Sequence, residues 1–221
     1  RLPKSPIYST FIGRSPQTAR ERTKAPSGGF TMNFLAHAWL AQPGNDGFLY
    51  GNLIADGVKG SDLSAWSPSV ASGIRHHRRV DAWVDQHPSV LLAKRRAPKM
   101  QRRYAGIALD IVWDHFIARQ HAGTEQHALV ERCYRLLTAW PAPQRLWTMM
   151  PILVEQDWLR RYADFDFTCR AVSGIGQRLS GANRLAELVP WLREDYAALE
   201  QDFSRLWSEC RAELTSQGDA H

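Results

Sequence analysis

The amino-acid sequence predicts an all-α protein, and three observations carry this prediction. Apolar residues recur at helical spacing through most of the chain after residue 32. No segment of useful length alternates strictly between apolar and polar residues from one hairpin turn to the next, as strands would. Proline and glycine fall between the periodic segments, where they end one helix before the next begins. A length of 221 residues suits one sizeable helical domain.

The boundaries of the expected helices follow from the places where the apolar period stops. In order, the helices cover 33–41, 48–58, 67–86, 101–119, 125–140, shorter pieces within 144–180, and 190–214. The interruptions are Pro43-Gly44, Gly60, Pro88 and Pro141-Ala142-Pro143. The third helix has the strongest start, because Ser67 can cap it and Pro68 is well tolerated in its first turn.

Three segments of different character divide the chain. Residues 1–31 are expected to be a flexible extension upstream of Met32, which reads as a natural first residue, with a transit-like peptide as the alternative. They hold six basic residues and one acidic residue, so most of the net charge of +6 lies there. The helical domain is expected over 32–215, and 216–221 form a short tail. The domain itself is nearly neutral, so the net charge does not indicate nucleic-acid binding.

Other features of the composition concern the cellular compartment. No apolar run approaches the roughly 18–20 residues that a membrane helix needs. The first residues contain no apolar stretch typical of a secretory signal. The three cysteines are far apart, with neither disulfide-framework nor zinc-site spacing. We therefore expect a cytoplasmic protein without a membrane partner.

Four short patterns of polar residues stand out within the first half of the domain. They are Asn33-Phe34-Leu35-Ala36-His37, Gly51-Asn52-Leu53-Ile54-Ala55-Asp56, His76-His77-Arg78-Arg79-Val80-Asp81 and Asp110-Ile111-Val112-Trp113-Asp114-His115. In each, polar residues four positions apart share one helix face. A carboxylate on an apolar face is costly unless it is paired, hydrogen-bonded or bound to a cation. Imidazoles with carboxylates suit divalent Mn, Fe, Co or Zn, and helical bundles build metal sites this way.

Each pattern also has a structural interpretation that stays open at this point. Asp56 can cap a helix or pair with Lys59, and His37 can be a buried histidine with satisfied hydrogen bonds. His77 and Asp81 can form a surface ion pair, with His76 as a solvated neighbour. Asp110 and Asp114 can be structural carboxylates. The remaining histidines, which lack a partnering pattern, are expected to be structural: His87, His121, His127 and His221.

These four patterns resemble, in order and spacing, the motifs of the bacterial acyl carrier protein phosphodiesterases, also called ACP hydrolases. The resemblance extends through Trp158-Leu159-Arg160-Arg161-Tyr162 and Asp166-Phe167, and covers most of residues 32–210. It implies a helical bundle like that of the HD-domain phosphohydrolases and a divalent metal, usually Mn²⁺, with Mg²⁺, Fe²⁺ or Co²⁺ as alternatives. It also implies hydrolysis of the phosphodiester between 4′-phosphopantetheine and a serine of holo-acyl carrier protein.

Roles are assigned to the motif residues on this basis. His77, Asp81 and Asp110 are the expected metal ligands. Asp56, Asp114 and His115 are expected to be further ligands or general acid/base groups, and His37 is expected to be a catalytic residue. Arg78 or Arg79 is expected to hold the phosphate, since a guanidinium matches its oxygens. The expected reaction is in-line attack on phosphorus by a metal-activated water, with the serine oxygen leaving.

A basic run completes the candidate residues. Six of ten consecutive residues are basic and none is acidic: Lys94, Arg95, Arg96, Lys99, Arg102 and Arg103. Such a patch would steer an acidic carrier protein toward the site, although a solvated basic face is the plainer interpretation. No nucleic-acid recognition motif accompanies the run. The competing functions are an HD-like phosphohydrolase acting on nucleotides, a non-catalytic helical module that binds an acidic protein, and an RNA-binding protein.

Overall fold

The computed structural model describes residues 33–121, 123–178 and 184–215. Within these ranges the chain forms eleven α-helices and four short 3₁₀ helices, and no strand. The all-α prediction is therefore confirmed, whereas the likeness to HD-domain phosphohydrolases stays a prediction. The predicted extension 1–31 and tail 216–221 lie outside the described residues. None of the described helices combines the length and the apolar character needed to cross a membrane.

The helices of the first half agree closely with the expected segments. They are α1 (Phe34–Ala41), α2 (Asp46–Ile54), η1 (Ala55–Gly57), α3 (Pro68–Gln86), α4 (Pro88–Arg96), η2 (Arg102–Tyr104) and α5 (Ala105–Gln120). Ser67 caps α3 as predicted, because its side chain accepts a hydrogen bond from the main-chain N–H of Val70. Pro88 starts α4, a helix that the sequence interpretation had not delimited.

The second half contains shorter helices and one difference from the expectation. It comprises α6 (Thr124–Ala139), η3 (Gln144–Leu146), α7 (Met149–Glu155), α8 (Trp158–Arg161), α9 (Phe165–Arg178), η4 (Leu185–Leu188), α10 (Val189–Glu194) and α11 (Tyr196–Leu214). The single helix expected over 190–214 is divided at Asp195. Arg96 of α4 pairs with Asp195 at the division and with Asp202 further along α11, both at 2.6 Å. The division between α10 and α11 therefore coincides with a contact between α11 and the distant helix α4.

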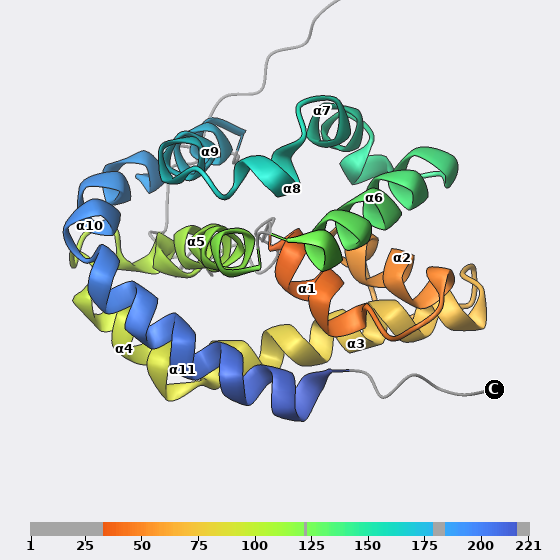
Figure 1. The fold of residues 1–221 in the computed structure, drawn as a ribbon, viewed down its shortest axis with the longest axis horizontal. Helices are drawn as coiled ribbons and strands as arrows, with labels where there is room; N and C mark the ends of the chain where they lie inside the picture. The colour runs from red at the N-terminus through yellow and green to blue at the C-terminus, as the bar shows by residue number, and fades with distance from the viewer. Residues whose placement is uncertain (1–32, 122, 179–183, 216–221) are drawn as a thin grey trace, which may run out of the picture.

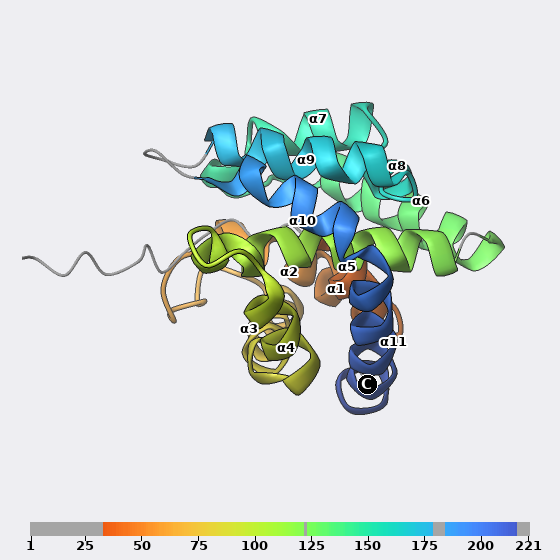
Figure 2. The ribbon, with the colours of Figure 1, turned by 90° about the vertical axis from the view of Figure 1, so that its left-hand side faces the viewer.

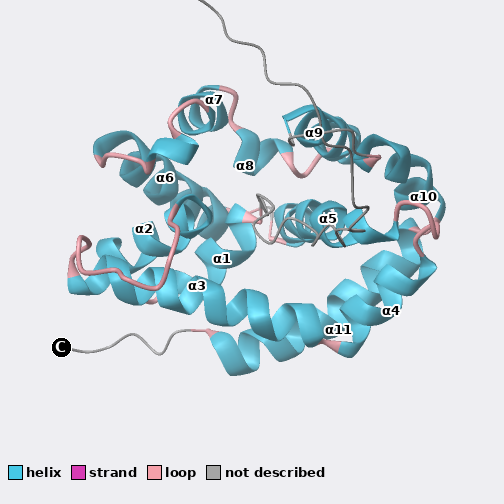
Figure 3. Ribbon diagram, turned by 180° about the vertical axis from the view of Figure 1, so that it is seen from behind, coloured by secondary structure: helices cyan, strands magenta, loops and turns pink. Residues whose placement is uncertain are grey.

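Helix α5 lies at the centre of the molecule. Figures 1 and 2 show it passing between α6 to α10 on one side and α3, α4 and α11 on the other, and the view from behind in Figure 3 shows the same arrangement. Residues 111–118 are all buried, so α5 has no solvent-facing side along this stretch. This accounts for the polar residues Asp114 and His115 being fully enclosed by protein.

A close crossing of α2 and α3 brings two of the predicted patterns together. A methyl group added to Gly51 would lie 2.2 Å from the main-chain oxygen of Val70, and one on Gly73 would lie 2.1 Å from that of Phe48. Only glycine permits such an approach of two helix backbones. The crossing places the last turn of α2 beside the middle of α3, where His77 and Asp81 lie.

Candidate active site

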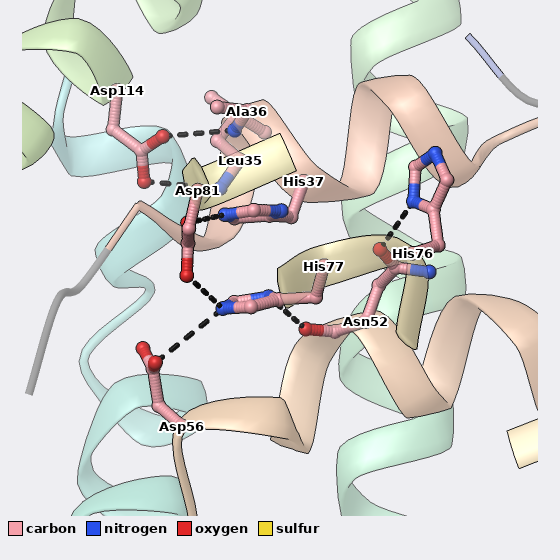
Figure 4. Close-up of polar contacts among 9 residues, drawn as sticks. All are labelled: Leu35, Ala36, His37, Asn52, Asp56, His76, His77, Asp81 and Asp114. Atoms are coloured by element: carbon pink, nitrogen blue, oxygen red, sulfur yellow. Dashed lines mark hydrogen bonds and ion pairs between the residues drawn. The ribbon is translucent and has the colours of Figure 1, made fainter. Parts of the chain in front are cut away.

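Three of the predicted residues converge in one cluster, which Figure 4 shows. His37 comes from α1, and His77 and Asp81 lie one turn apart on α3. The Nε2 atoms of His37 and His77 lie 3.1 and 3.2 Å from the two oxygens of Asp81. The two imidazole rings are stacked, with centroids 3.7 Å apart and planes 15° apart. One potential ligand atom from each residue falls within 4.8 Å of the others.

The orientation of His77 is set by a main-chain carbonyl. Its Nδ1 lies 2.8 Å from the carbonyl oxygen of Asn52, which can only accept, so Nδ1 must carry the hydrogen. The opposite nitrogen, Nε2, then faces oxygens of Asp81 at 3.2 Å and Asp56 at 3.4 Å. In a neutral imidazole this Nε2 is itself an acceptor. Three acceptors thus face one another unless a proton or a metal cation lies between them.

The electrostatics of the pair follow from this arrangement. Burial opposes a charge on His77, yet its hydrogen bonds to the carboxylates of Asp56 and Asp81 raise its pKa to about 10. Burial likewise opposes a charge on Asp81, but the hydrogen bonds from His37 and His77 hold its pKa well below the usual range. In the protein without metal, an imidazolium at His77 therefore occupies the place of a cation beside ionised Asp81.

Asn52 is a positioning residue that the sequence interpretation missed. It lies in the last turn of α2, where carbonyl groups are open to partners outside the helix. Its side-chain amide donates to the carbonyl of Phe48 at 3.0 Å, and its Oδ1 lies 2.8 Å from Nδ1 of His76. His76 is buried, and its other nitrogen contacts the carbonyl of Leu214 at 2.8 Å. The Asn52–Asp56 spacing was visible in the sequence, but the use of a main-chain oxygen was not.

His37 has one nitrogen in the cluster and one outside it. Its Nδ1 is buried and has no hydrogen-bond partner among the described residues. Burial and the neighbouring charge of His77 lower the pKa of His37. The structure thus groups His37 with His77 and Asp81, as a candidate ligand rather than only a general acid or base.

Two further carboxylates lie around this cluster. Asp56, on η1, approaches His77 from a different direction than Asp81 does (Figure 4). Asp110, on α5, contributes no atom to the tight group and forms no hydrogen bond or ion pair within the described ranges. Burial, followed by the negative charges of Asp81 and Asp85, raises the pKa of Asp110 well above its usual value. The negative charge of Asp81 therefore raises the pKa of Asp110, although Asp110 is not part of the tight group of potential ligand atoms.

Asp114 and His115 are not brought into the cluster. The two oxygens of Asp114 accept hydrogen bonds from the main-chain N–H groups of Leu35 and Ala36, at 3.0 and 2.8 Å, and so cap the start of α1. Burial raises the pKa of Asp114 to about 8, although these bonds favour the anion. Its position gives Asp114 a structural task in place of the catalytic one expected from the sequence.

His115 projects from α5 toward a different set of partners. Its Nδ1 lies 2.7 Å from the carbonyl oxygen of Tyr162, so it donates there, and its Nε2 accepts from the hydroxyl of Tyr196 at 2.7 Å. Arg119 donates to the same hydroxyl at 2.7 Å. Both nitrogens are satisfied, and the ring has no free lone pair for a metal. The expected catalytic role of His115 is not supported by this position.

The two arginines expected at the phosphate differ in their surroundings. Arg78 donates to the main-chain oxygens of Gly60 and Val58, at 2.8 and 2.9 Å, and ties the segment after η1 to α3. We therefore do not retain Arg78 as the phosphate ligand. Arg79 is exposed and has no ion-pair partner within the described ranges.

The basic run divides into two groups of three. The first group is used within the fold: Lys94 pairs with Asp85, Arg96 with Asp195 and Asp202, and Arg102 with the carbonyls of Arg95 and Ala97. The second group, Arg95, Lys99 and Arg103, is exposed and has no acidic partner among the residues described here. Arg103 stacks over the ring of Tyr104, with 4.6 Å between its guanidinium carbon and the ring centre. Only this second group is available to a partner.

Comparison with known proteins adds evidence independent of this geometry. The sequence model of the family described as acyl carrier protein phosphodiesterase matches residues 32–210. A Shigella boydii protein named acyl carrier protein phosphodiesterase is 34% identical over 190 residues, which is 83% of this chain and 98% of that protein. An Escherichia coli O6:H1 protein of the same name is 35% identical over 178 residues, 78% of this chain and 92% of that protein. No solved structure matches this chain significantly. The chain belongs to the acyl carrier protein phosphodiesterase family.

Proposed function

We propose that this protein hydrolyses the phosphodiester linking 4′-phosphopantetheine to a serine of holo-acyl carrier protein, with a divalent cation held by His37, His77 and Asp81. One observation carries the proposal. The buried Nε2 atom of His77, whose Nδ1 donates to a main-chain carbonyl, faces the carboxylates of Asp56 and Asp81 beneath the stacked ring of His37, an arrangement that only a proton or a metal cation completes. Membership in the family supports the choice of substrate.

The donor set fits such a cation. Two imidazoles and carboxylate oxygens suit Mn²⁺, Fe²⁺ or Co²⁺, and we propose Mn²⁺ first. Asp56 stands beside His77, so its carboxylate can complete the coordination. A bound divalent cation would lower the pKa of a water molecule and take up charge from a phosphoryl oxygen.

The chain's own groups would prepare the site in three ways. Asp81 holds both imidazoles through its two oxygens, and the Asn52 carbonyl fixes which nitrogen of His77 faces the proposed cation site. Such supporting contacts orient ligands and sharpen their affinity. Asp56 would act either as a further ligand or as the general acid that protonates the departing serine oxygen, a contribution of about 10²–10⁴ in rate. Exposed Arg79 is the remaining candidate for the non-bridging phosphate oxygens.

Recognition of the carrier is the second part of the proposal. Acyl carrier proteins are strongly acidic, and Arg95, Lys99 and Arg103 present positive charge without acidic partners in the described structure. Complementary charge raises the association rate and orients the encounter. A cytoplasmic location follows from the same proposal, because the carrier substrate is cytoplasmic.

A mass spectrum of the carrier tests the function directly. Holo-acyl carrier protein incubated with the enzyme and Mn²⁺ should lose the mass of 4′-phosphopantetheine and become the apo form. Prior treatment with EDTA should stop the reaction, and added Mn²⁺ should restore it. An unchanged holo carrier, together with turnover of a nucleotide from a parallel panel, would replace this proposal with a nucleotide phosphohydrolase.

A further inference from the structure

Exposed large apolar side chains gather in one part of the molecule. Among the described residues four stand out, and three of them belong to α4 or the turn after it: Leu91, Leu92 and Met100 are 42%, 45% and 70% exposed. The fourth, Trp147, is 61% exposed and lies just before α7. Figures 1 and 2 place α4 and α7 on opposite sides of the molecule. Three large apolar residues are thus exposed within ten consecutive residues, and exposed apolar residues that gather in one region are typical of binding surfaces.

Two of these residues, Leu91 and Leu92, lie on the exposed side of α4, and Met100 belongs to the turn that follows this helix. The helix buries Val90 and Ala93 against the core, so Leu91, Leu92 and Arg95 point to solvent. Arg102 then bonds the main-chain oxygens at the end of α4 and folds the following turn back onto the helix. The resulting docking face consists of Leu91, Leu92, Arg95, Lys99, Met100 and Arg103.

The charge of the docking face selects its partner. It holds three cations and no acid. The acidic residues around it have partners within the fold: Asp85 pairs with Lys94, Asp195 and Asp202 with Arg96, Glu187 with Arg184, and Glu209 with His87. Apolar side chains flanked by uncompensated positive charge complement an acidic helix that has a few exposed apolar residues. Apolar contacts in the centre of an interface supply affinity, and charges around them supply orientation.

Helix α4, which carries part of the docking face, also contacts the helix that carries the candidate site. Asp85 lies one helical turn beyond Asp81 on α3, and Lys94 of α4 contacts it at 2.7 Å. Arg95 is the next residue along α4. The scissile bond joins phosphorus to a serine oxygen on the carrier itself, so the body of the carrier must lie against the rim of the site. A docking surface for this reaction must therefore begin next to the cluster.

We infer that the docking face binds the acidic carrier protein through its apolar residues as well as its cations. This inference rests on the proposed function for the identity of the partner. Leu91, Leu92 and Met100 contact apolar residues of a carrier helix, while Arg95, Lys99 and Arg103 pair with the acidic residues around them. Lys94, Arg96 and Arg102 hold the fold and make no contribution to docking.

Two double variants test the two halves of the face. Leu91→Ser with Leu92→Ser removes apolar contact, and Arg95→Glu with Lys99→Glu reverses charge. Each should raise KM for holo-carrier, and the Kd of apo-carrier measured by calorimetry, by roughly tenfold, with kcat much less affected. Raising the salt concentration should weaken binding by the wild type and the leucine variant alike, and should have little effect on the charge-reversed variant.

Matched controls come from other parts of the molecule. Trp147→Ser removes an exposed apolar side chain just before α7, and Arg170→Glu reverses an exposed charge on α9. Both should behave as wild type. Unchanged Kd in the leucine variant, or an equal change in the controls, would overturn the inference. The Kd of apo-carrier tests docking separately from the proposed function, because apo-carrier lacks the phosphodiester bond that the enzyme would cleave. Docking to phosphatidylglycerol vesicles instead of apo-carrier would also overturn it, in favour of a membrane surface.

Discussion

Two polar groups in this protein look alike in sequence and differ completely in their surroundings. In the cluster of α1 and α3, His77 is held by one carbonyl and turns its other nitrogen toward carboxylates. On α5, His115 donates to one carbonyl and accepts from one hydroxyl, and neighbouring Asp114 accepts from two main-chain N–H groups. His77, Asp114 and His115 are all buried. Only in the cluster of α1 and α3 does a neutral histidine turn an acceptor nitrogen, Nε2 of His77, toward carboxylate oxygens, which are acceptors too.

The difference teaches what identifies a reactive site. A buried polar residue is costly in either place, and the question is which partner offsets the cost. The protein itself satisfies His115 and Asp114, so they stabilise the fold. The acceptor atoms of the cluster gain a partner only when an extra proton or a cation lies between them. The pKa of His77 is accordingly raised to about 10, whereas the pKa of His115, which needs no extra proton, is lowered.

The largest expected effect is the loss of activity in Asp81→Ala. Removing the carboxylate that joins both imidazoles should lower kcat/KM by more than about 100-fold, since even contacts that only support a ligand are worth 10–100-fold. Mn²⁺ affinity, measured by calorimetry, should fall in parallel, and the helical circular dichroism spectrum should persist. Asp166→Ala, which removes an exposed carboxylate on α9, is the control. Full activity in Asp81→Ala would remove the cluster from the chemistry.

Asp114→Ala should instead reduce stability. It leaves the buried N–H groups of Leu35 and Ala36 without an acceptor, which should cost about 2–4 kcal/mol of unfolding free energy in urea titrations. Activity per folded molecule should stay within a few-fold of wild type. If Asp114→Ala lost Mn²⁺ binding as severely as Asp81→Ala, Asp114 would belong to the metal site and would not have a purely structural role.

Gly73→Ala tests how the crossing of α2 and α3 supports the cluster. The added methyl group cannot fit 2.1 Å from the Phe48 oxygen, so the helices must separate, at about 1–3 kcal/mol. Because the Asn52 carbonyl would move away from His77, Mn²⁺ affinity should fall by roughly tenfold. Gly174→Ala in α9 meets no atom within 4 Å and should leave both properties unchanged or slightly raise stability.

The smallest effect concerns the pH dependence of stability. Burial lowers the pKa of His115 in the folded state, so the unfolded chain binds more protons below about pH 6.5. The contribution of neutral His115 to the free energy of unfolding is therefore complete above that pH and is lost as the pH falls. His115→Gln should reduce the slope of unfolding free energy between pH 7 and 5 by at most about 1.4 kcal/mol per pH unit.

Much of the fold was predictable because helix signals are local. Ser67 and Pro68 start α3 as expected, and Pro141 follows the end of α6, since capping and proline geometry act within a few residues. The division at Asp195 was not predictable from the helical period. Arg96 lies about a hundred residues earlier in the chain, and its contact with Asp195 exists only in the folded molecule.

The sequence alone determined the helical class, the family motifs and the pairing of His77 with Asp81, because residues four apart on a helix always share a face. The tertiary structure decided that His37 joins that pair, that Asp114 caps α1, and that half of the basic run serves the fold. These choices depend on contacts between distant helices. A main-chain carbonyl such as that of Asn52 carries no signal in the sequence, because every residue has one.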